Sequence, residues 1–145
     1  MPQTTKYETD VIAWANEQAA LLRAGNFAAL DIEHIADEVE DVGKSEQREL
    51  ESRMALLLCH LLKWQLQPER RGASWEATIR VQRNGVALRI KRTPSLKASI
   101  NDPEWWQLAW GDAVYQAEKE AGLTAFAETC PWSYEQVMDQ AFFPN

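Results

Sequence analysis

The strongest apolar pattern lies in residues 45–67, SEQRELESRMALLLCHLLKWQLQ, where apolar side chains recur at spacings of three and four. That period is typical of one face of an α-helix. Residues 54–62 are apolar almost all the way round, so this helix needs neighbours on every side. A run of nine residues is far shorter than the roughly 20 that cross a bilayer. We therefore expect a buried central helix, capped by Ser45 and ended by Pro68.

The same period predicts further helices on both sides of this one. Alternating Val86, Leu88 and Ile90 also fit a strand, but one strand without a partner cannot satisfy its backbone, so a helix is favoured there. The pattern predicts an all-α, single-domain helical bundle of about five main helices, residues 1–145, with an aromatic-rich C-terminal tail that folds back over it. The other expected elements run from a cap at Thr9 or Asp10 to about Ala24, from Ile32 (capped by Asp31) to Val42 with Gly43 as its end, from a Ser74 cap to Pro94, from Ser95 to Ile100, from Pro103 (capped by Asp102) to Gly122, and from Ser133 to Met138.

Composition adds the cellular setting. A chain of 145 residues can bury one sizeable core, and seven tryptophans enlarge it. The start of the chain, MPQTTKYETD, is polar and acidic, unlike a signal peptide. Cys59 and Cys130 form neither a metal motif nor a disulfide framework. We expect a protein of the reducing cytoplasm, with no membrane segment and no cofactor.

The net charge of −7 hides three blocks. Residues 1–62 and 98–145 each carry net −7, whereas residues 63–97 carry net +7. The basic block could bind phosphate, in nucleic acid or lipid. It could instead be neutralised by the acidic blocks within the molecule. The second interpretation is favoured, because the flanking blocks match it in magnitude and would repel a polyanion.

One polar cluster is a candidate metal site. His34 and Glu38 share a helix face, and His60 lies at the edge of the central helix. If their two helices packed antiparallel, the three side chains could converge as ligands for zinc, manganese or iron. The paired Glu-x-x-His signature of di-iron bundles is missing, so a hydrogen-bonded structural histidine is the favoured alternative.

A second cluster combines Glu38 with Arg71, Arg80 or Arg83. A carboxylate at the edge of a core needs a partner, and arginine can supply two hydrogen bonds. A structural ion-pair network is favoured, and a ligand-anchoring arginine cluster in a tryptophan-lined cleft is the alternative.

The sequence carries no nucleophile elbow, phosphate loop, dinucleotide loop or Cys-x-x-Cys motif. A nucleic-acid site could combine Trp64 and Trp75 with the basic residues between Arg70 and Arg92. Against it, the sequence pI is near 4.9, opposite to that of a typical nucleic-acid binder.

Three runs resemble the bacterial domain of unknown function 29 family: YETDVIAWANEQAALLRAGNFAALDIEHIADEVEDVGKSEQREL from Tyr7, HLLKWQLQPERRGASWEATIRVQR from His60, and ETCPWSYEQVMD from Glu128. The resemblance extends from about Tyr7 to Pro144 and implies an all-helical bacterial protein without an assigned activity. His34 departs from the family pattern, which often has asparagine there, and this weakens the metal interpretation. The positions that look like family signatures are Glu38, His60, Lys63, Trp64, Gln65, Pro68, Arg71, Trp75 and Arg83.

These patterns predict a small cytoplasmic interaction or scaffold protein without catalytic activity, binding an unknown partner or itself as a homodimer. One alternative is a nucleic-acid-binding module that uses residues 63–97, and another is a metal-dependent hydrolase-like site at Glu38 and His60. The candidate binding residues are Glu38, His60, Trp64, Arg71, Trp75, Arg80 and Arg83.

Overall fold

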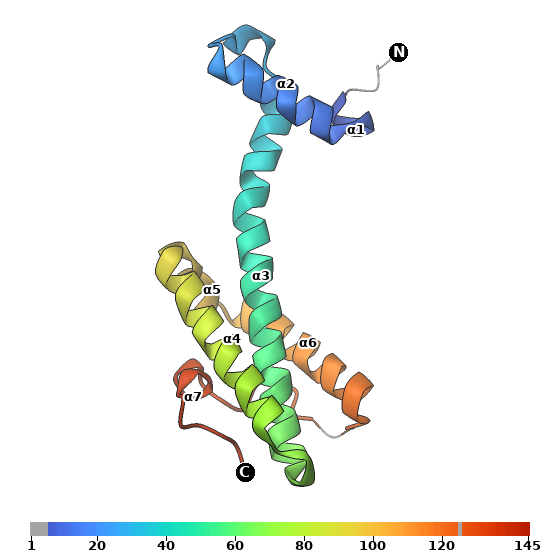
Figure 1. Ribbon diagram of the computed structural model, residues 1–145, viewed down its shortest axis with the longest axis vertical. Helices are drawn as coiled ribbons and strands as arrows, with labels where there is room; N and C mark the ends of the chain where they lie inside the picture. Colours follow the sequence, from blue (N-terminus) through green and yellow to red (C-terminus); the bar gives the residue numbers. More distant parts are fainter. Residues whose placement is uncertain (1–5, 125) are drawn as a thin grey trace. The chain divides into compact units, whose positions relative to one another are not determined.

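The computed structural model describes residues 6–124 and 126–145, and these residues form helices and connecting loops without a strand. The predicted all-α fold is confirmed (Figure 1). Four helices are long, and the remaining helices and 3₁₀ turns are short. In chain order the elements are α1 (Lys6–Thr9), α2 (Val11–Arg23), η1 (Phe27–Ala29), α3 (Ile32–Leu66), η2 (Pro68–Arg70), α4 (Ala73–Arg92), η3 (Pro94–Leu96), α5 (Lys97–Ile100), α6 (Pro103–Ala121) and α7 (Tyr134–Met138).

The chain divides into two compact units, residues 1–45 and residues 46–145. Helix α3 contributes its first turns to the first unit and the rest to the second. The expectation that the whole chain is one domain stays a prediction. No helix among the described residues combines the length and apolar character that crossing a membrane requires.

Helix α3 corrects one predicted boundary. It begins at Ile32, after Asp31, as expected, but it does not end at Gly43. Gly43 lacks the positive φ of a helix-ending glycine, which among the described residues is found at Gly25 and Gly122. A single interior glycine costs a helix only about 1 kcal/mol, and the good helix formers around Gly43 outweigh it. Ser45, predicted as a cap, therefore lies inside the helix.

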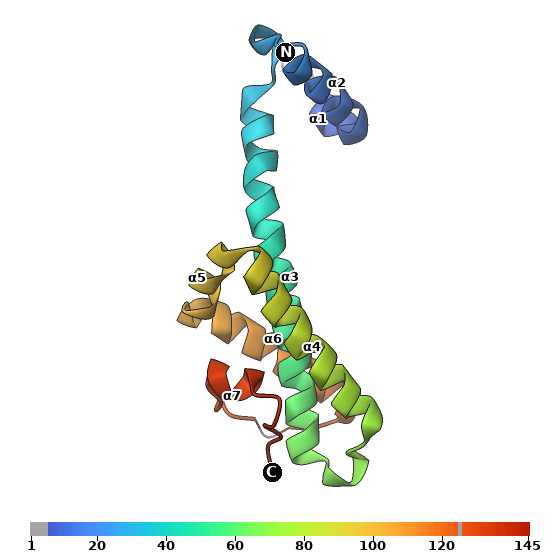
Figure 2. The same ribbon diagram turned by 60° about the vertical axis from the view of Figure 1, so that its left-hand side comes forward.

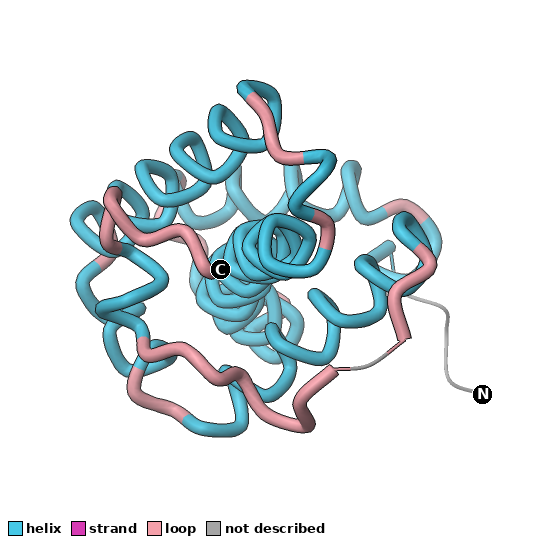
Figure 3. The backbone as a smooth tube through the Cα atoms, turned by 90° about the horizontal axis from the view of Figure 1, so that it is seen from below, coloured by secondary structure: helices cyan, strands magenta, loops and turns pink. Residues whose placement is uncertain are grey.

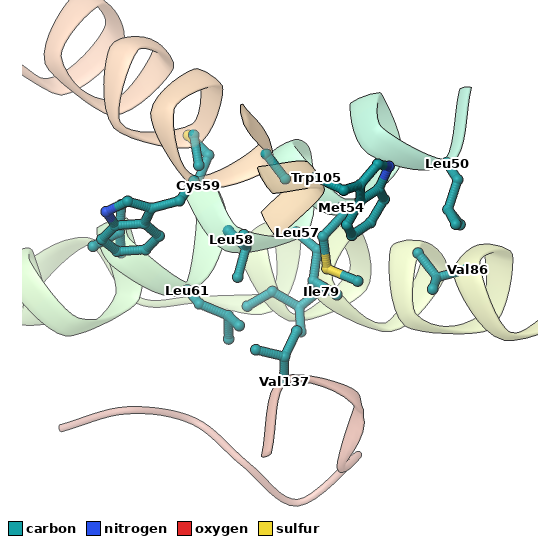
Figure 4. Close-up of a cluster of buried hydrophobic side chains, with 14 of the residues drawn as sticks. Leu50, Met54, Leu57, Leu58, Cys59, Leu61, Ile79, Val86, Trp105 and Val137 are labelled. Atoms are coloured by element: carbon teal, nitrogen blue, oxygen red, sulfur yellow. The ribbon is translucent and has the colours of Figure 1, made fainter. Parts of the chain in front are cut away.

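The second unit is built around the C-terminal half of α3. The apolar stretch predicted to be central is buried there: Leu57, Leu58, Cys59 and Leu61 have no exposed surface. Helices α4 and α6 cross it and the C-terminal segment lies beside it (Figures 2 and 3). Ile79 and Val86 come from α4, Trp105 from α6, and Val137 of α7 points toward Ile79 (Figure 4).

Helix α4 is helical throughout, which confirms the choice of helix over strand. Its N-cap is Gly72 in an extended conformation, not Ser74 as predicted; Ser74 lies in the first turn, where its carbonyl accepts from the Thr78 hydroxyl. Gly85 has a packing role, because a Cβ built there would lie 3.0 Å from Nη1 of Arg53. The missing side chain leaves room for a guanidinium from α3.

The predicted ends of α6 and α7 are confirmed. The Asp102 carboxylate accepts from the Glu104 amide, and Gly122 ends α6 in the left-handed conformation. Ser133 and Gln136 form a capping box at α7. The tail does fold back over the second unit, since Phe142 and Phe143 pack against its core.

The first unit is held differently. Asp10, one of the two predicted caps, caps α2 by accepting from the Ala13 amide, and Gly25 follows the end of the helix with φ 71°. Among described residues 6–45, however, only Trp14 and Gln18 are buried. This unit has little apolar core of its own.

Candidate functional site

Arg83 is the most buried charged side chain of the candidate set, with 1% of its surface exposed. Its Nε donates to the Val137 carbonyl at 2.7 Å and its Nη2 to the Phe142 carbonyl at 2.6 Å. The guanidinium lies 5.4 Å from the Phe143 ring. Burial lowers the pKa of Arg83, and the charge of Asp139 opposes that shift. Arg83 thus ties the C-terminal segment to α4.

Arg71 and Trp64 continue this anchor. Arg71 Nε donates to the Trp64 carbonyl at 2.6 Å, and its Nη2 to the Pro144 carbonyl at 3.5 Å. The Trp64 ring packs on Phe143 with centroids 4.8 Å apart and carries the Arg71 guanidinium at 5.4 Å. Three predicted site residues therefore meet, but they hold main-chain carbonyls and an aromatic tail. In this geometry the three side chains anchor the C-terminal segment.

Lys63 belongs to a second polar group in the same unit. Its ammonium is buried, pairs with the Glu120 carboxylate and lies 6.0 Å from the centroid of the Trp75 ring. His60 lies three residues before Lys63 and is half-buried, and its Nδ1 donates to the Leu56 carbonyl at 3.0 Å. Burial is the main cause of the lowered pKa of His60. Burial favours the neutral imidazole, and the hydrogen bond to Leu56 satisfies one ring nitrogen at the edge of the core.

The two thiols are poor nucleophiles. Burial raises the pKa of Cys59 to about 11, and burial also raises the pKa of Cys130. Both cysteines are free. Because the thiolate is the reactive form, neither side chain is activated at neutral pH.

In the first unit, Asp31 is the centre of a network that sequence reasoning identified only as a helix cap. Its Oδ2 accepts from Trp14 Nε1 at 3.0 Å and pairs with His34 Nδ1 at 2.7 Å, while its amide donates to Gln18 Oε1 at 2.8 Å. The hydrogen bond to Asp31 raises the pKa of His34, and the same bond lowers the pKa of Asp31. The network fixes α2 to the first turn of α3.

Glu38 accepts from the Tyr7 hydroxyl at 2.7 Å, and Tyr7 stacks on His34 with ring centroids 4.0 Å apart. That hydrogen bond is the main reason why the pKa of Tyr7 rises to about 12. The three-residue spacing of Asp31 and His34 could have indicated this cluster from the sequence. Nothing in the sequence indicated the role of Tyr7. Glu38 thus has a tyrosine partner in place of the predicted arginine.

The predicted ligand set of His34, Glu38 and His60 depended on a chain reversal at Gly43. Continuous helix from Ile32 to Leu66 removes that reversal. Within residues 6–124 and 126–145, no three His, Cys, Asp or Glu side chains form a group that could hold a metal ion.

The first unit exposes an unusual amount of apolar surface. Ile32, Val39 and Val42 on α3 are 66%, 67% and 67% exposed. With half-buried Ile35 they repeat at spacings of three, four and three, so they form one stripe on α3. Of the twelve large apolar residues exposed in the described chain, seven lie in the short first unit, namely Val11, Ile12, Leu22, Phe27, Ile32, Val39 and Val42.

Arg80 differs from the other candidate arginines because it is exposed on the outward face of α4. Lys91 and Arg92 are exposed on the same helix, and no described carboxylate lies at ion-pair distance from any of the three. Arg89, by contrast, is paired with Glu46 and Glu49. The acidic flanks therefore neutralise only part of the basic block.

These features define an all-helical protein with a closed core in residues 46–145 and an apolar, acidic surface in residues 6–45. The model of the family called Domain of unknown function DUF29 matches residues 6–143, and the chain belongs to that family. No activity is assigned by this membership. No curated protein matches the chain. No solved structure matches it either.

Proposed function

We propose that this protein is a non-enzymatic interaction module whose binding surface is the apolar stripe of Ile32, Ile35, Val39 and Val42 on α3. The observation that carries the proposal is the exposure of this stripe in a unit that buries only two of its described side chains. Apolar patches that stay open to water typically mark protein-interaction sites. We also place the protein in the bacterial cytoplasm, in agreement with its two free cysteines.

The charge around the stripe specifies the partner. Residues 1–45 carry three basic and nine acidic groups, net −6. Glu33, Glu40 and Asp41 are exposed on the two sides of the stripe, each about 100° around the helix from its neighbour Ile32, Val39 or Val42. Long lysine or arginine side chains of a helix laid on the stripe would reach towards these carboxylates. The fitting partner is an amphipathic helix with an apolar face bordered by lysine or arginine.

The test uses fluorescein-labelled helical peptides of equal length, one patterned from leucine and lysine and one from leucine and glutamate. Fluorescence anisotropy should show binding of the Leu/Lys peptide alone. Val39→Asn should weaken the affinity for this peptide by roughly 10-fold or more, which corresponds to the free energy of burying one valine side chain. Asparagine keeps the charge constant, so the loss reports the apolar contact.

Leu108→Asn is the matched control, because Leu108 is 66% exposed on α6 of the other unit. Its affinity should equal that of the wild type. Equal loss in both variants, or no binding of the Leu/Lys peptide, would overturn the proposal.

Nucleic-acid binding through residues 63–97 is the weaker alternative. Its support is the exposure of Arg80, Lys91 and Arg92 on α4, where no carboxylate of the described residues pairs with them. Trp64 and Trp75, which would supply base stacking, are instead engaged with Arg71 and Lys63. Binding to generic DNA or RNA that weakens steeply with salt would favour it over a helix partner.

A further inference from the structure

A partly open pocket lies between α3 and α4, within residues 46–145, and its volume is about 390 Å³. It is lined by Glu46 and Arg53 of α3 and by Gly85, Leu88, Arg89 and Arg92 of α4. The α4 residues follow one another at spacings of three, one and three, so they share one face of that helix. Three guanidinium groups and one carboxylate therefore line the same pocket.

The arginines of this pocket have hydrogen-bonding capacity that the protein uses only in part. A guanidinium carries five N–H donors. Arg89 donates to Glu46 at 3.4 Å and to Glu49 at 3.2 Å. Arg53 donates to Gln82 at 3.4 Å, and its buried Nε lies 3.3 Å from the Glu49 carboxylate without forming a hydrogen bond. These contacts are longer than the roughly 2.7–2.9 Å of a well-formed bond between charged groups, so donors remain free for a ligand.

Two further features distinguish this pocket from an ordinary surface ion-pair network. A Cβ built at Gly85 would lie 3.0 Å from Nη1 of Arg53, so the glycine makes room for that guanidinium. Arg92 is exposed in the last turn of α4, and none of the carboxylates that the structure describes lies at ion-pair distance from it. The pocket thus holds more positive charge than its own carboxylate neutralises.

We propose that this arginine pocket, formed by Arg53, Arg89 and Arg92, binds the phosphate group of a small molecule. A phosphate group has three strong acceptor oxygens, and planar guanidinium groups donate to such oxygens in pairs. A volume of about 390 Å³ lies within the range of small-molecule sites and leaves room for a group attached to the phosphate. No residue of the α3 stripe contributes to the pocket, so this inference goes beyond the proposed function and does not depend on it.

The carboxylates near the pocket favour a small ligand over a nucleic-acid backbone. Glu46 would repel a phosphate, but its side chain is 44% exposed and its contact with Arg89 is long, so it can turn to solvent as one phosphate takes its place. A nucleic acid would bring several phosphates toward Glu46 and Glu49, whereas a phosphomonoester brings one.

The experiment is an NMR titration of the isotope-labelled full chain with sodium phosphate and, separately, with ribose 5-phosphate, at an ionic strength held constant with sodium chloride. The arginine Nε–H signals and the amides of residues 85–93 should shift and saturate, with a Kd on the order of 1 mM or tighter. Tighter binding of ribose 5-phosphate assigns the pocket to a phosphomonoester, and equal binding assigns it to the free ion. Ribose alone should cause no shift.

Three variants test the lining of the pocket. Arg89→Gln and Arg92→Gln should each weaken phosphate binding by roughly 10-fold or more, because each removes a charged donor. Gly85→Ala should also weaken it, since the new Cβ displaces the Arg53 guanidinium while the charge of the chain stays constant. Alanine favours a helix over glycine, so this variant should remain folded.

Arg80→Gln is the matched control, because Arg80 is exposed on the same helix but does not line the pocket. It should bind phosphate like the wild type, and circular dichroism verifies that every variant is folded. Shifts that do not saturate, or equal losses in Arg80→Gln and Arg89→Gln, would overturn the proposal. A single-stranded oligonucleotide that binds more tightly than ribose 5-phosphate, and that Arg80→Gln weakens, would overturn it in favour of nucleic-acid binding.

Discussion

Replacing Arg83 by alanine should loosen the C-terminal segment from the second unit. The change removes two hydrogen bonds from a charged donor, at 2.7 Å to the Val137 carbonyl and at 2.6 Å to the Phe142 carbonyl. Hydrogen bonds to charged groups contribute about 1.5–3 kcal/mol each, and the orphaned carbonyls add a desolvation cost. The site is almost fully enclosed, so water cannot easily replace the guanidinium. We expect a loss of about 3–5 kcal/mol in the free energy of unfolding, a large share of the usual total.

Urea denaturation followed by tryptophan fluorescence measures this loss, since six of the seven tryptophans lie in residues 46–145. Hydrogen exchange should localise it, with the largest loss of protection at residues 134–143. Arg80→Ala is the matched control, three residues earlier on α4 but exposed, and should change stability by less than about 0.5 kcal/mol. A loss below about 1 kcal/mol for Arg83→Ala, or equal losses for both variants, would refute the anchoring role.

Two further predictions concern titration. By NMR, the pKa of His34 should lie above the reference value of about 6.5 and that of His60 below it, and Asp31→Asn should return the pKa of His34 toward the reference. The stabilisation from the His34–Asp31 pair is therefore present below the reference pKa and is lost as the pH rises through the pKa of the folded state. A pKa of His34 at or below the reference would contradict this. Burial and the neighbouring Asp112 raise the pKa of Glu51 from 4.5 to about 7, so its ionisation destabilises the fold as the pH rises through that range. Glu51→Gln should raise the free energy of unfolding by about 1–3 kcal/mol near pH 8 and change it little near pH 4, whereas an equal effect at both pH values would show that the carboxyl is not strained by ionisation.

Local signals predicted most of the fold. Asp10, Asp102 and Ser133 cap helices where the sequence places them, and Gly25 and Gly122 end helices with positive φ. Capping and glycine conformation depend on neighbouring residues, so one sequence suffices to locate them. The predicted helix end at Gly43 was wrong, because whether an interior glycine ends a helix depends on the residues around it as well as on its own propensity.

The candidate site was harder to predict, because its contacts are long-range. Trp64, Arg71 and Arg83 do come together, but their partners are carbonyls of residues 137–144, and a backbone acceptor leaves no mark in the sequence. The three- and four-residue spacing from Ile32 to Val42 predicts an apolar helix face. It does not predict that this face is exposed, because periodicity cannot distinguish a face packed in the core from one left open to a binding partner.

The central claim is that the stripe on α3 is the binding surface, and NMR mapping tests it most directly. Isotope-labelled protein is titrated with the unlabelled Leu/Lys peptide, and amide and methyl shifts are followed. The account predicts the largest changes at Ile32, Ile35, Val39 and Val42, with little change at Leu108 on α6. Shifts concentrated in residues 46–145, with the stripe unmoved, would contradict it.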